Sequence, residues 1–239
     1  MTMPVSTSHD QNKIQNTGSD ENPREIITLM CQNFYRLGWV SGTGGGISIK
    51  RGDRLYMAPS GVEKEKIRSE DVFVLDAAGE ILEPAANPNL KLSECAPLFQ
   101  SAYDLRDAGA VIHSHSVNVV LATMLATRQS GFISTLEFTQ LEMLKGLAGH
   151  GYYDTFVLPV IDNTPRECEL TESLRAAMQQ FPKTPAIAVR NHGIYVWGRN
   201  EIQAKTQAEC IDYLCEIKVK MHAAGITNHL QQPDAAQVG

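Results

Sequence analysis

A pair of histidines at the end of a short apolar run constrains this chain more than any other feature. The run 108–112 is small and β-branched, which is typical of a buried strand, and His113 and His115 follow it. Residues two apart in a strand share a face, so the two imidazoles would lie roughly 7 Å apart along the backbone. A third histidine, His192, lies about eighty residues further on. We predict that these three side chains build a catalytic metal site; the alternative is histidines that only pack in the core or face solvent.

The composition excludes several classes of protein. The 239 residues carry a net charge of −6 and no run of basic residues, which argues against non-specific binding to nucleic acid. No apolar stretch approaches the roughly 20 residues of a membrane span. The five cysteines form no CxxC pair, and an odd number fits no complete disulfide framework. We therefore expect a cytoplasmic protein with neither nucleic acid nor membrane as a partner.

The two ends of the chain differ from its middle. Residues 1–22 are rich in Ser, Thr, Asn, Gln and Asp and lack the apolar segment of a signal peptide, so we predict a disordered tail. Residues 226–239 are predicted to form a loose C-terminal tail. The segment between them, residues 23–225, is predicted to be a single domain.

Helical and strand-like patterns alternate along this domain. Consecutive hairpins near its beginning favour a largely antiparallel sheet over a doubly wound parallel one. We expect strands in the middle and helices on both sides, in one α/β domain. The predicted strands are 47–50, 54–58, 72–76, 81–82, 108–112, 154–161, 186–189 and 194–197, and the predicted helices are 23–37, 93–105, 116–126, 137–147, 164–180 and 201–224.

A glycine-rich loop at residues 41–46 precedes the first predicted strand. It is not a dinucleotide fingerprint, because its spacing is not GxGxxG and it opens into a strand rather than a helix. It also lacks the lysine of a phosphate-binding P-loop. What remains is a loop whose backbone N–H groups can turn toward an anion, or a merely flexible turn. A second small-residue turn, Ser60-Gly61, follows the next strand.

One cysteine lies in an unusual place. Cys95 falls in the first turn of the predicted helix 93–105, where the helix dipole favours a thiolate or a strong hydrogen bond. The alternative is a small core residue.

Five motifs in order resemble the methylthioribulose-1-phosphate dehydratases of the class II aldolase superfamily, across residues 24–225. The resemblance implies a three-layer α/β/α fold with a mixed, mostly antiparallel central sheet. It also implies one Zn²⁺ per subunit, a small phosphorylated ketose as substrate, and a homotetramer with sites near the subunit contacts. The motifs are Gly42-Thr43-Gly44-Gly45-Gly46-Ile47-Ser48, Ala58-Pro59-Ser60-Gly61-Val62, His113-Ser114-His115-Ser116, Glu142-Met143-Leu144-Lys145-Gly146 and Arg190-Asn191-His192-Gly193-Ile194-Tyr195-Val196-Trp197-Gly198.

The resemblance also implies roles for single residues. The zinc ligands would be His113, His115 and His192, the arrangement of a catalytic zinc that keeps one position open. Glu142 would be the general acid and base, with Glu137 as a rival carboxylate. Cys95 would orient the substrate; it occupies the position where sugar-phosphate aldolases of this fold carry their catalytic glutamate.

The phosphate group of the substrate would bind at the two small-residue turns. The resemblance assigns it to Thr43 and Gly44 in the first turn and to Ser60 and Gly61 in the second. One departure affects this assignment, because many members of the superfamily have Asn where this chain has Gly46.

The reaction that these roles imply is a dehydration. It would convert 5-methylthioribulose 1-phosphate into 2,3-diketo-5-methylthiopentyl 1-phosphate in the methionine salvage pathway. Two alternatives remain: an aldolase or epimerase of a ketose phosphate on the same fold, or a non-catalytic interaction module.

Overall fold

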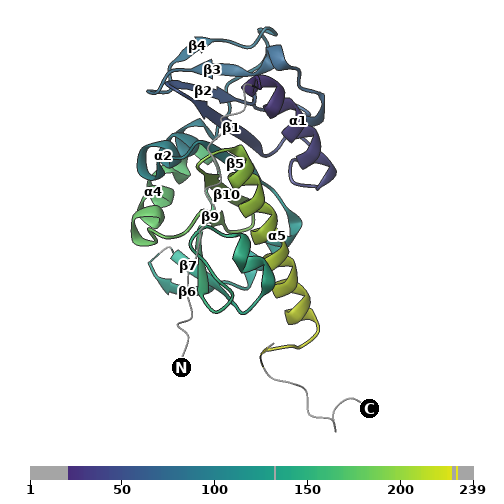
Figure 1. Cartoon of the computed structure of the whole chain (residues 1–239), viewed down its shortest axis with the longest axis vertical. Coiled ribbons are helices and arrows are strands. Elements are labelled where there is room, and N and C mark those ends of the chain that lie inside the picture. The colour runs from purple at the N-terminus through teal and green to yellow at the C-terminus, as the bar shows by residue number, and fades with distance from the viewer. Residues whose placement is uncertain (1–20, 132, 228–229, 231–239) are drawn as a thin grey trace, which may run out of the picture.

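A ten-stranded sheet forms the centre of the molecule in a computed structural model, which describes residues 21–131, 133–227 and 230 (Figure 1). Its strands run in the order β4-β3-β2-β1-β5-β10-β9-β8-β7-β6. Neighbouring strands are antiparallel except for β8 and β9, so the sheet is mixed and mostly antiparallel, as predicted. The strands are β1 Gly46–Arg51, β2 Arg54–Met57, β3 Phe73–Leu75, β4 Ile81–Glu83, β5 Ala110–Ser114, β6 Thr127–Ser130, β7 Ile133–Thr139, β8 Thr155–Ile161, β9 Ala186–Val189 and β10 Gly193–Gly198.

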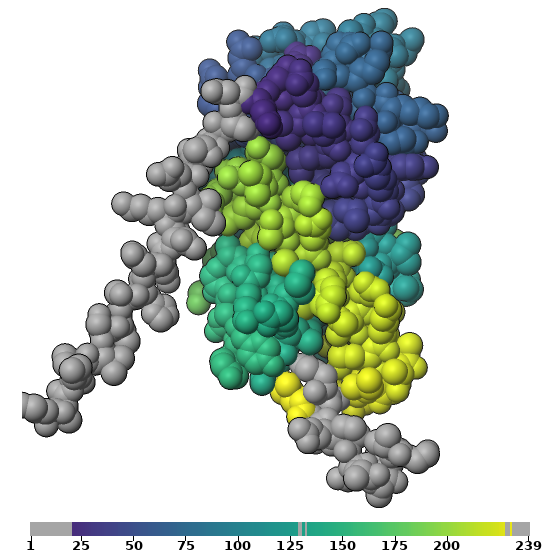
Figure 2. Space-filling view, turned by 45° about the vertical axis from the view of Figure 1, so that its right-hand side comes forward, coloured from purple at the N-terminus to yellow at the C-terminus, as the bar shows by residue number. Residues whose placement is uncertain are grey.

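Helices cover both faces of this sheet. One apolar cluster joins the sheet to α1, α3 and α5, and a second joins its other face to α2 and α4, which gives the expected three layers. Figure 2 shows α1 in purple and α5 in yellow on one face, with the teal segment that contains η3 beside α5. The helices are α1 Pro23–Arg36, α2 Ala96–Arg106, α3 Val117–Met124, α4 Thr171–Gln180 and α5 Glu201–Ala223, and the short 3₁₀ turns are η1 Lys64–Lys66, η2 Ser69–Asp71, η3 Glu142–Gly146 and η4 Glu167–Leu170.

Side-chain caps fix the beginnings of three helices where the sequence places them. The side chain of Asn22 accepts a hydrogen bond from the second residue of α1, and Pro23 occupies the first helical position. Ser116 caps α3 in the same way, and Asn200 caps α5. The predictions for these helices are confirmed to within one or two residues.

The predicted helix at 137–147 is wrong. Residues 133–139 form β7, which pairs with β8 along its whole length, and the helical part shrinks to the single 3₁₀ turn η3. The apolar spacing of this segment suits either a helix or a strand. The segment forms a strand because pairing with the strongly apolar β8 satisfies the backbone hydrogen-bonding groups of both segments. Gln140, with φ of 51°, then turns the chain into η3.

The segment 164–180 also differs from its prediction. The sequence suggests a capping box with Thr164 at the N-cap and Glu167 three residues later. In the structure a 3₁₀ turn, η4, precedes α4, and the Thr164 hydroxyl donates to the carbonyl of Arg166 instead. Glu167 turns its side chain away from the helix end and into the sheet edge, where the candidate site lies.

The predicted N-terminal tail falls almost wholly on residues 1–20, which lie outside the described residues, as does most of the predicted C-terminal tail. Within the described ranges, no helix is both long and apolar enough to cross a membrane.

Candidate metal centre

Four side chains converge at one edge of the sheet. His113 and His115 come from the end of β5, His192 from the turn between β9 and β10, and Glu167 from η4. Each offers one ligand atom, and these four atoms all lie within 4.8 Å of one another. The structure therefore brings the three predicted histidines together, and it adds a carboxylate to them. We call these four residues the metal cluster.

The spacing within the metal cluster suits a small divalent metal ion. The Nε2 atoms of His113 and His115 lie 2.8 Å apart, and those of His115 and His192 lie 3.2 Å apart. Glu167 Oε1 lies 3.1 Å from the Nε2 atoms of both His113 and His192. A tetrahedral zinc with bonds of about 2.0–2.1 Å would separate its ligand atoms by about 3.3 Å. The donor set and its spacing thus fit a tetrahedral metal site.

Hydrogen bonds at Nδ1 orient two of the imidazole rings so that Nε2 can bind a metal. His113 Nδ1 lies 3.1 Å from the carbonyl oxygen of Ile194, and His192 Nδ1 lies 3.1 Å from the side-chain oxygen of Asn163. When Nδ1 carries the proton and donates it to these oxygens, Nε2 keeps its lone pair for a metal. Tyr195 stacks on the His113 ring with centroids 4.1 Å apart, which holds that ring in place.

The protonation states of the cluster favour metal binding. Burial and the neighbouring His113 and His192 lower the pKa of His115 to about 3, and burial likewise lowers the pKa of His113. Burial alone would raise the pKa of Glu167. Hydrogen bonds with His113 and His192 outweigh that effect and hold the pKa well below its ordinary value. At neutral pH the site is therefore two buried neutral imidazoles and a carboxylate beside His192, which are the forms that ligate a metal.

Glu167 was not predicted as a member of the site. Its spacing after Thr164 and Pro165 resembles a helix cap, which is the more common use of that pattern. A signal does exist: Glu167 follows β8, His192 follows β9, and these two strands are parallel neighbours. Side chains that follow neighbouring parallel strands lie at the same edge of the sheet. Recognising the parallel pair from sequence would have placed Glu167 beside His192.

Cys95 touches the metal cluster, but not as a thiolate. It is the N-cap residue of α2, is 3% exposed, and donates a hydrogen bond from Sγ to Glu167 Oε2 at 3.0 Å. Tyr195 donates to its sulfur at 3.6 Å. Burial and the nearby charge of Glu167 raise the pKa of Cys95 far above its ordinary value. Of the two forms expected for Cys95, the structure shows the strong hydrogen bond, while burial opposes the thiolate that the helix dipole would favour.

Glu142 does not join the metal cluster within one subunit. It begins η3, its side chain is 72% exposed, and it pairs with Lys145 at 2.9 Å. The rival carboxylate Glu137 is also exposed, on β7. Among the described residues, the carboxylate that the fold places at the histidines is Glu167.

The glycine loop lies directly on the metal cluster. A Cβ atom added at Gly44 would lie 2.4 Å from Nδ1 of His115, far closer than non-bonded atoms approach. Two residues later, a Cβ at Gly46 would meet its nearest atom, Cε of Lys64, at an ordinary 3.9 Å. The loop therefore needs glycine at position 44 because its backbone packs against a metal-binding imidazole.

Gly44→Ala is expected to weaken metal binding at least about tenfold while the fold persists, because the new methyl group must displace the His115 ring. Gly46→Ala is the matched control and should bind metal like the unsubstituted protein. Chelator competition measures both affinities, and circular dichroism checks the fold. Equal metal affinity in the two variants would contradict this description of the loop.

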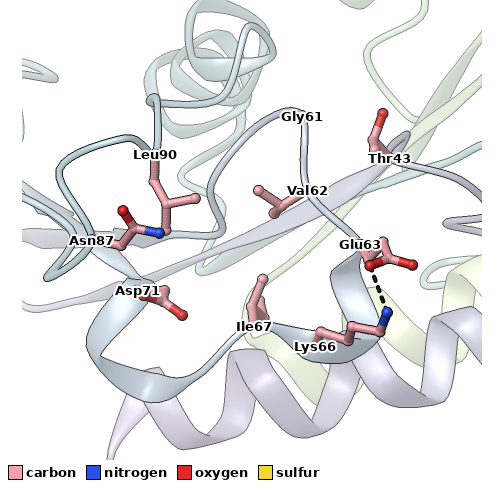
Figure 3. A pocket seen from close by; sticks show the side chains of 9 residues that line it. All are labelled: Thr43, Gly61, Val62, Glu63, Lys66, Ile67, Asp71, Asn87 and Leu90. Atoms are coloured by element: carbon pink, nitrogen blue, oxygen red, sulfur yellow. Dashed lines mark hydrogen bonds and ion pairs between the residues drawn. The ribbon is translucent and has the colours of Figure 1, made fainter.

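The two turns predicted to bind phosphate border a common cavity. Thr43 and Gly61 both line a cavity of about 360 Å³, shown in Figure 3, in which Glu63 pairs with Lys66 at 2.6 Å. No member of the metal cluster is among the described residues that line it. Ser60 pairs through its backbone with Lys91 and so holds the second turn against the loop 87–91.

Comparisons with known proteins agree with this fold. The profile of the family "Class II Aldolase and Adducin N-terminal domain" matches residues 25–219. A solved L-fuculose 1-phosphate aldolase superposes with a TM-score of 0.70 at 20% identity, covering 91% of this chain and 93% of that one. At this identity the likeness concerns the fold alone.

Relatives in sequence are considerably more similar. A probable methylthioribulose-1-phosphate dehydratase from Dictyostelium discoideum is 49% identical over 215 residues, which cover 86% of this chain and 90% of the relative. One from Drosophila melanogaster is 49% identical over 213 residues, covering 86% and 92%. A probable bifunctional dehydratase/enolase-phosphatase E1 from Populus trichocarpa is also 49% identical, but this chain spans only 41% of its length.

The fold, the metal cluster and the profile match define a class II aldolase-type protein. The chain belongs to the class II aldolase and adducin N-terminal domain family and, within it, groups with the methylthioribulose-1-phosphate dehydratases.

Proposed function

We propose that the protein dehydrates 5-methylthioribulose 1-phosphate to 2,3-diketo-5-methylthiopentyl 1-phosphate, a step of methionine salvage. The observation that carries the proposal is the pairing of a complete histidine cluster with Cys95 at its side. Sugar-phosphate aldolases of this fold have a glutamate at the position of Cys95, so the acid–base group of this site must come from elsewhere. This chain matches two relatives over most of their length, and their names support the same reaction.

The metal is proposed to be Zn²⁺, one per subunit, held by His113, His115 and His192. Imidazole donors at tetrahedral spacing suit zinc, although the same donors also bind iron and cobalt. When bound, the ion supplies Lewis acidity that makes the proton on C3, next to the C2 ketone, removable. Glu167 would be a further residue able to hold the ion, because its Oε1 lies within the same group of donor atoms. Its other oxygen already accepts a hydrogen bond from Cys95.

Glu142 is proposed to remove the C3 proton as a general base and to protonate the departing C4 hydroxyl as the corresponding acid. Its exposed position requires that it reach the metal cluster of a neighbouring copy. The resemblance implies a homotetramer with sites near subunit contacts, and such an assembly allows this. Cys95 is proposed to orient the substrate by hydrogen bonding from its neutral thiol. The proposed reaction needs no covalent intermediate.

The phosphate is proposed to bind at the turns that contain Thr43, Gly44, Ser60 and Gly61, by backbone N–H groups and hydroxyls. The five cysteines are all free, which suits a reducing compartment, and we propose a cytoplasmic location.

A turnover assay with three phosphorylated ketoses tests the function. Methylthioribulose 1-phosphate should be consumed at least about a hundredfold faster than fuculose 1-phosphate or ribulose 5-phosphate, because only its reaction uses the proposed acid–base group. Metal-stripped protein serves as the control, and restoring Zn²⁺ should restore the rate. Preferential turnover of fuculose 1-phosphate would establish an aldolase instead, and no turnover of any substrate by zinc-loaded protein would favour an interaction module.

A further inference from the structure

Lys64 is a buried cation next to the proposed phosphate site. Its side chain is only 1% exposed, although burying a charged amine is costly unless it is paired or hydrogen-bonded. It begins η1, whose last residue, Lys66, is exposed and pairs with Glu63. The proposed reaction gives Lys64 no role, so its burial calls for another explanation.

The hydrogen bonds of Lys64 connect the two turns proposed to hold the phosphate. Nζ donates to the carbonyl oxygen of Thr43 at 2.9 Å and to that of Val62 at 3.3 Å. Thr43 belongs to the glycine loop, and Val62 directly follows Ser60-Gly61. One ammonium group therefore fixes the distance between two segments that lie about twenty residues apart in the sequence.

The surroundings of Lys64 also make it a source of positive charge for an anion. Its stem packs beneath the glycine loop, since a Cβ at Gly46 would meet Cε of Lys64 at 3.9 Å. Burial lowers the pKa of Lys64, and the nearby groups Cys31, Cys95 and Glu167 act in the opposite direction. The two acidic residues of the cavity are already engaged, Glu63 by Lys66 and Asp71 by Arg68. The ammonium of Lys64 beneath the loop therefore donates its hydrogen bonds to carbonyl oxygens and does not pair with a carboxylate of the cavity.

We propose that Lys64 is the positioning residue of the phosphate site: its ammonium ties the turns 43–44 and 60–62 together and supplies the positive charge beneath them. The ligand it serves is a phosphoryl group on a small molecule. The identity of that molecule rests on the proposed function, but the binding of phosphate does not.

Lys64→Met in the zinc-loaded protein tests this role, because methionine keeps most of the length and removes both the charge and the donors. The control is Lys220→Met, at an exposed lysine near the end of α5 that pairs with Glu216. Four quantities are measured: the Kd for inorganic phosphate, by ³¹P NMR titration, the KM and the kcat for methylthioribulose 1-phosphate, and the metal content.

For Lys64→Met we expect the Kd for phosphate and the KM to rise about tenfold or more, because the positive charge beneath the anion and the tie between the two turns are lost. The kcat should change less than about threefold, and metal content should stay unchanged, because the metal cluster keeps its own contacts. The Lys220→Met variant should match the unsubstituted protein in all four quantities. A purely structural role for Lys64 would lower kcat and metal content together and would not single out phosphate.

Two results would overturn the proposal: phosphate affinity equal to that of the unsubstituted protein, or a loss confined to kcat and metal content. Lys64→Gln, which keeps one amide donor but no charge, provides the same test if the methionine variant does not fold. The phosphate titration needs no turnover. A protein that fails to dehydrate methylthioribulose 1-phosphate, but whose phosphate affinity still depends on Lys64, would disprove the proposed function and leave this inference standing.

Discussion

Glu167→Ala is expected to weaken metal binding roughly a hundredfold, as removal of one of four ligands should. In the structure Glu167 Oε1 lies 3.1 Å from the Nε2 atoms of His113 and His192, and hydrogen bonds with those rings hold its carboxyl ionised. Alanine removes the fourth donor and also leaves the thiol of Cys95 without its acceptor. Turnover should fall as well, but partly recover at high metal concentration.

The metal affinity is measured by chelator competition, and the visible spectrum of the Co²⁺-substituted protein reports the ligand set. The matched control is Glu169→Ala, which removes an exposed carboxylate from the same short turn, η4. If Glu167→Ala keeps both the affinity and the cobalt spectrum of the control, Glu167 is not a ligand and the cluster is the three-histidine site of the sequence prediction.

Glu142→Gln is expected to reduce dehydration by about 10²- to 10⁴-fold, the usual contribution of a general acid–base group, while leaving the metal bound. His115→Ala should lose both metal and turnover. The control for the carboxylate is Glu137→Gln, which changes an exposed glutamate on the nearby strand β7 and should keep its turnover. A fully active Glu142→Gln variant would disprove this role for Glu142.

Mixed assemblies of these two inactive variants show where Glu142 acts. A site needs an intact metal cluster from one copy and an intact Glu142 from its neighbour, so random mixing in a symmetric oligomer should restore about a quarter of the sites. Measurable turnover after co-expression of Glu142→Gln with His115→Ala would support action across a subunit contact. Mixed assemblies without turnover would exclude it.

The sequence allowed most of the fold to be predicted, because its signals are local. The caps at Asn22, Ser116 and Asn200 fix three helices, and short hairpins fix most strands. The segment 133–139 failed because its apolar spacing fits two structures, and pairing with β8, a contact distant in sequence, decides between them.

At the metal site, too, residues placed by their own strand could be predicted, and residues placed by contacts distant in the sequence could not. His113 and His115 are recognisable because their spacing belongs to one strand. Glu167 was not recognisable in the sequence, because its position at the site depends on β8 and β9 being parallel neighbours. Lys64 was missed for a related reason: in the run Glu63-Lys64-Glu65-Lys66 it looks like part of a solvated surface, and only the structure shows that it is buried. Burial also opposes the thiolate form of Cys95, whose strong hydrogen bond was expected.

The most direct test of the central claim is an NMR analysis of the product that zinc-loaded protein forms from ¹³C-labelled methylthioribulose 1-phosphate. A dehydratase must keep the five-carbon chain intact, lose the C4 hydroxyl and give a product with carbonyl carbons at C2 and C3. We expect this single product, and its formation should stop when the metal is removed. Cleavage of the C3–C4 bond into two fragments, or recovery of an epimer that still carries its C4 hydroxyl, would contradict it.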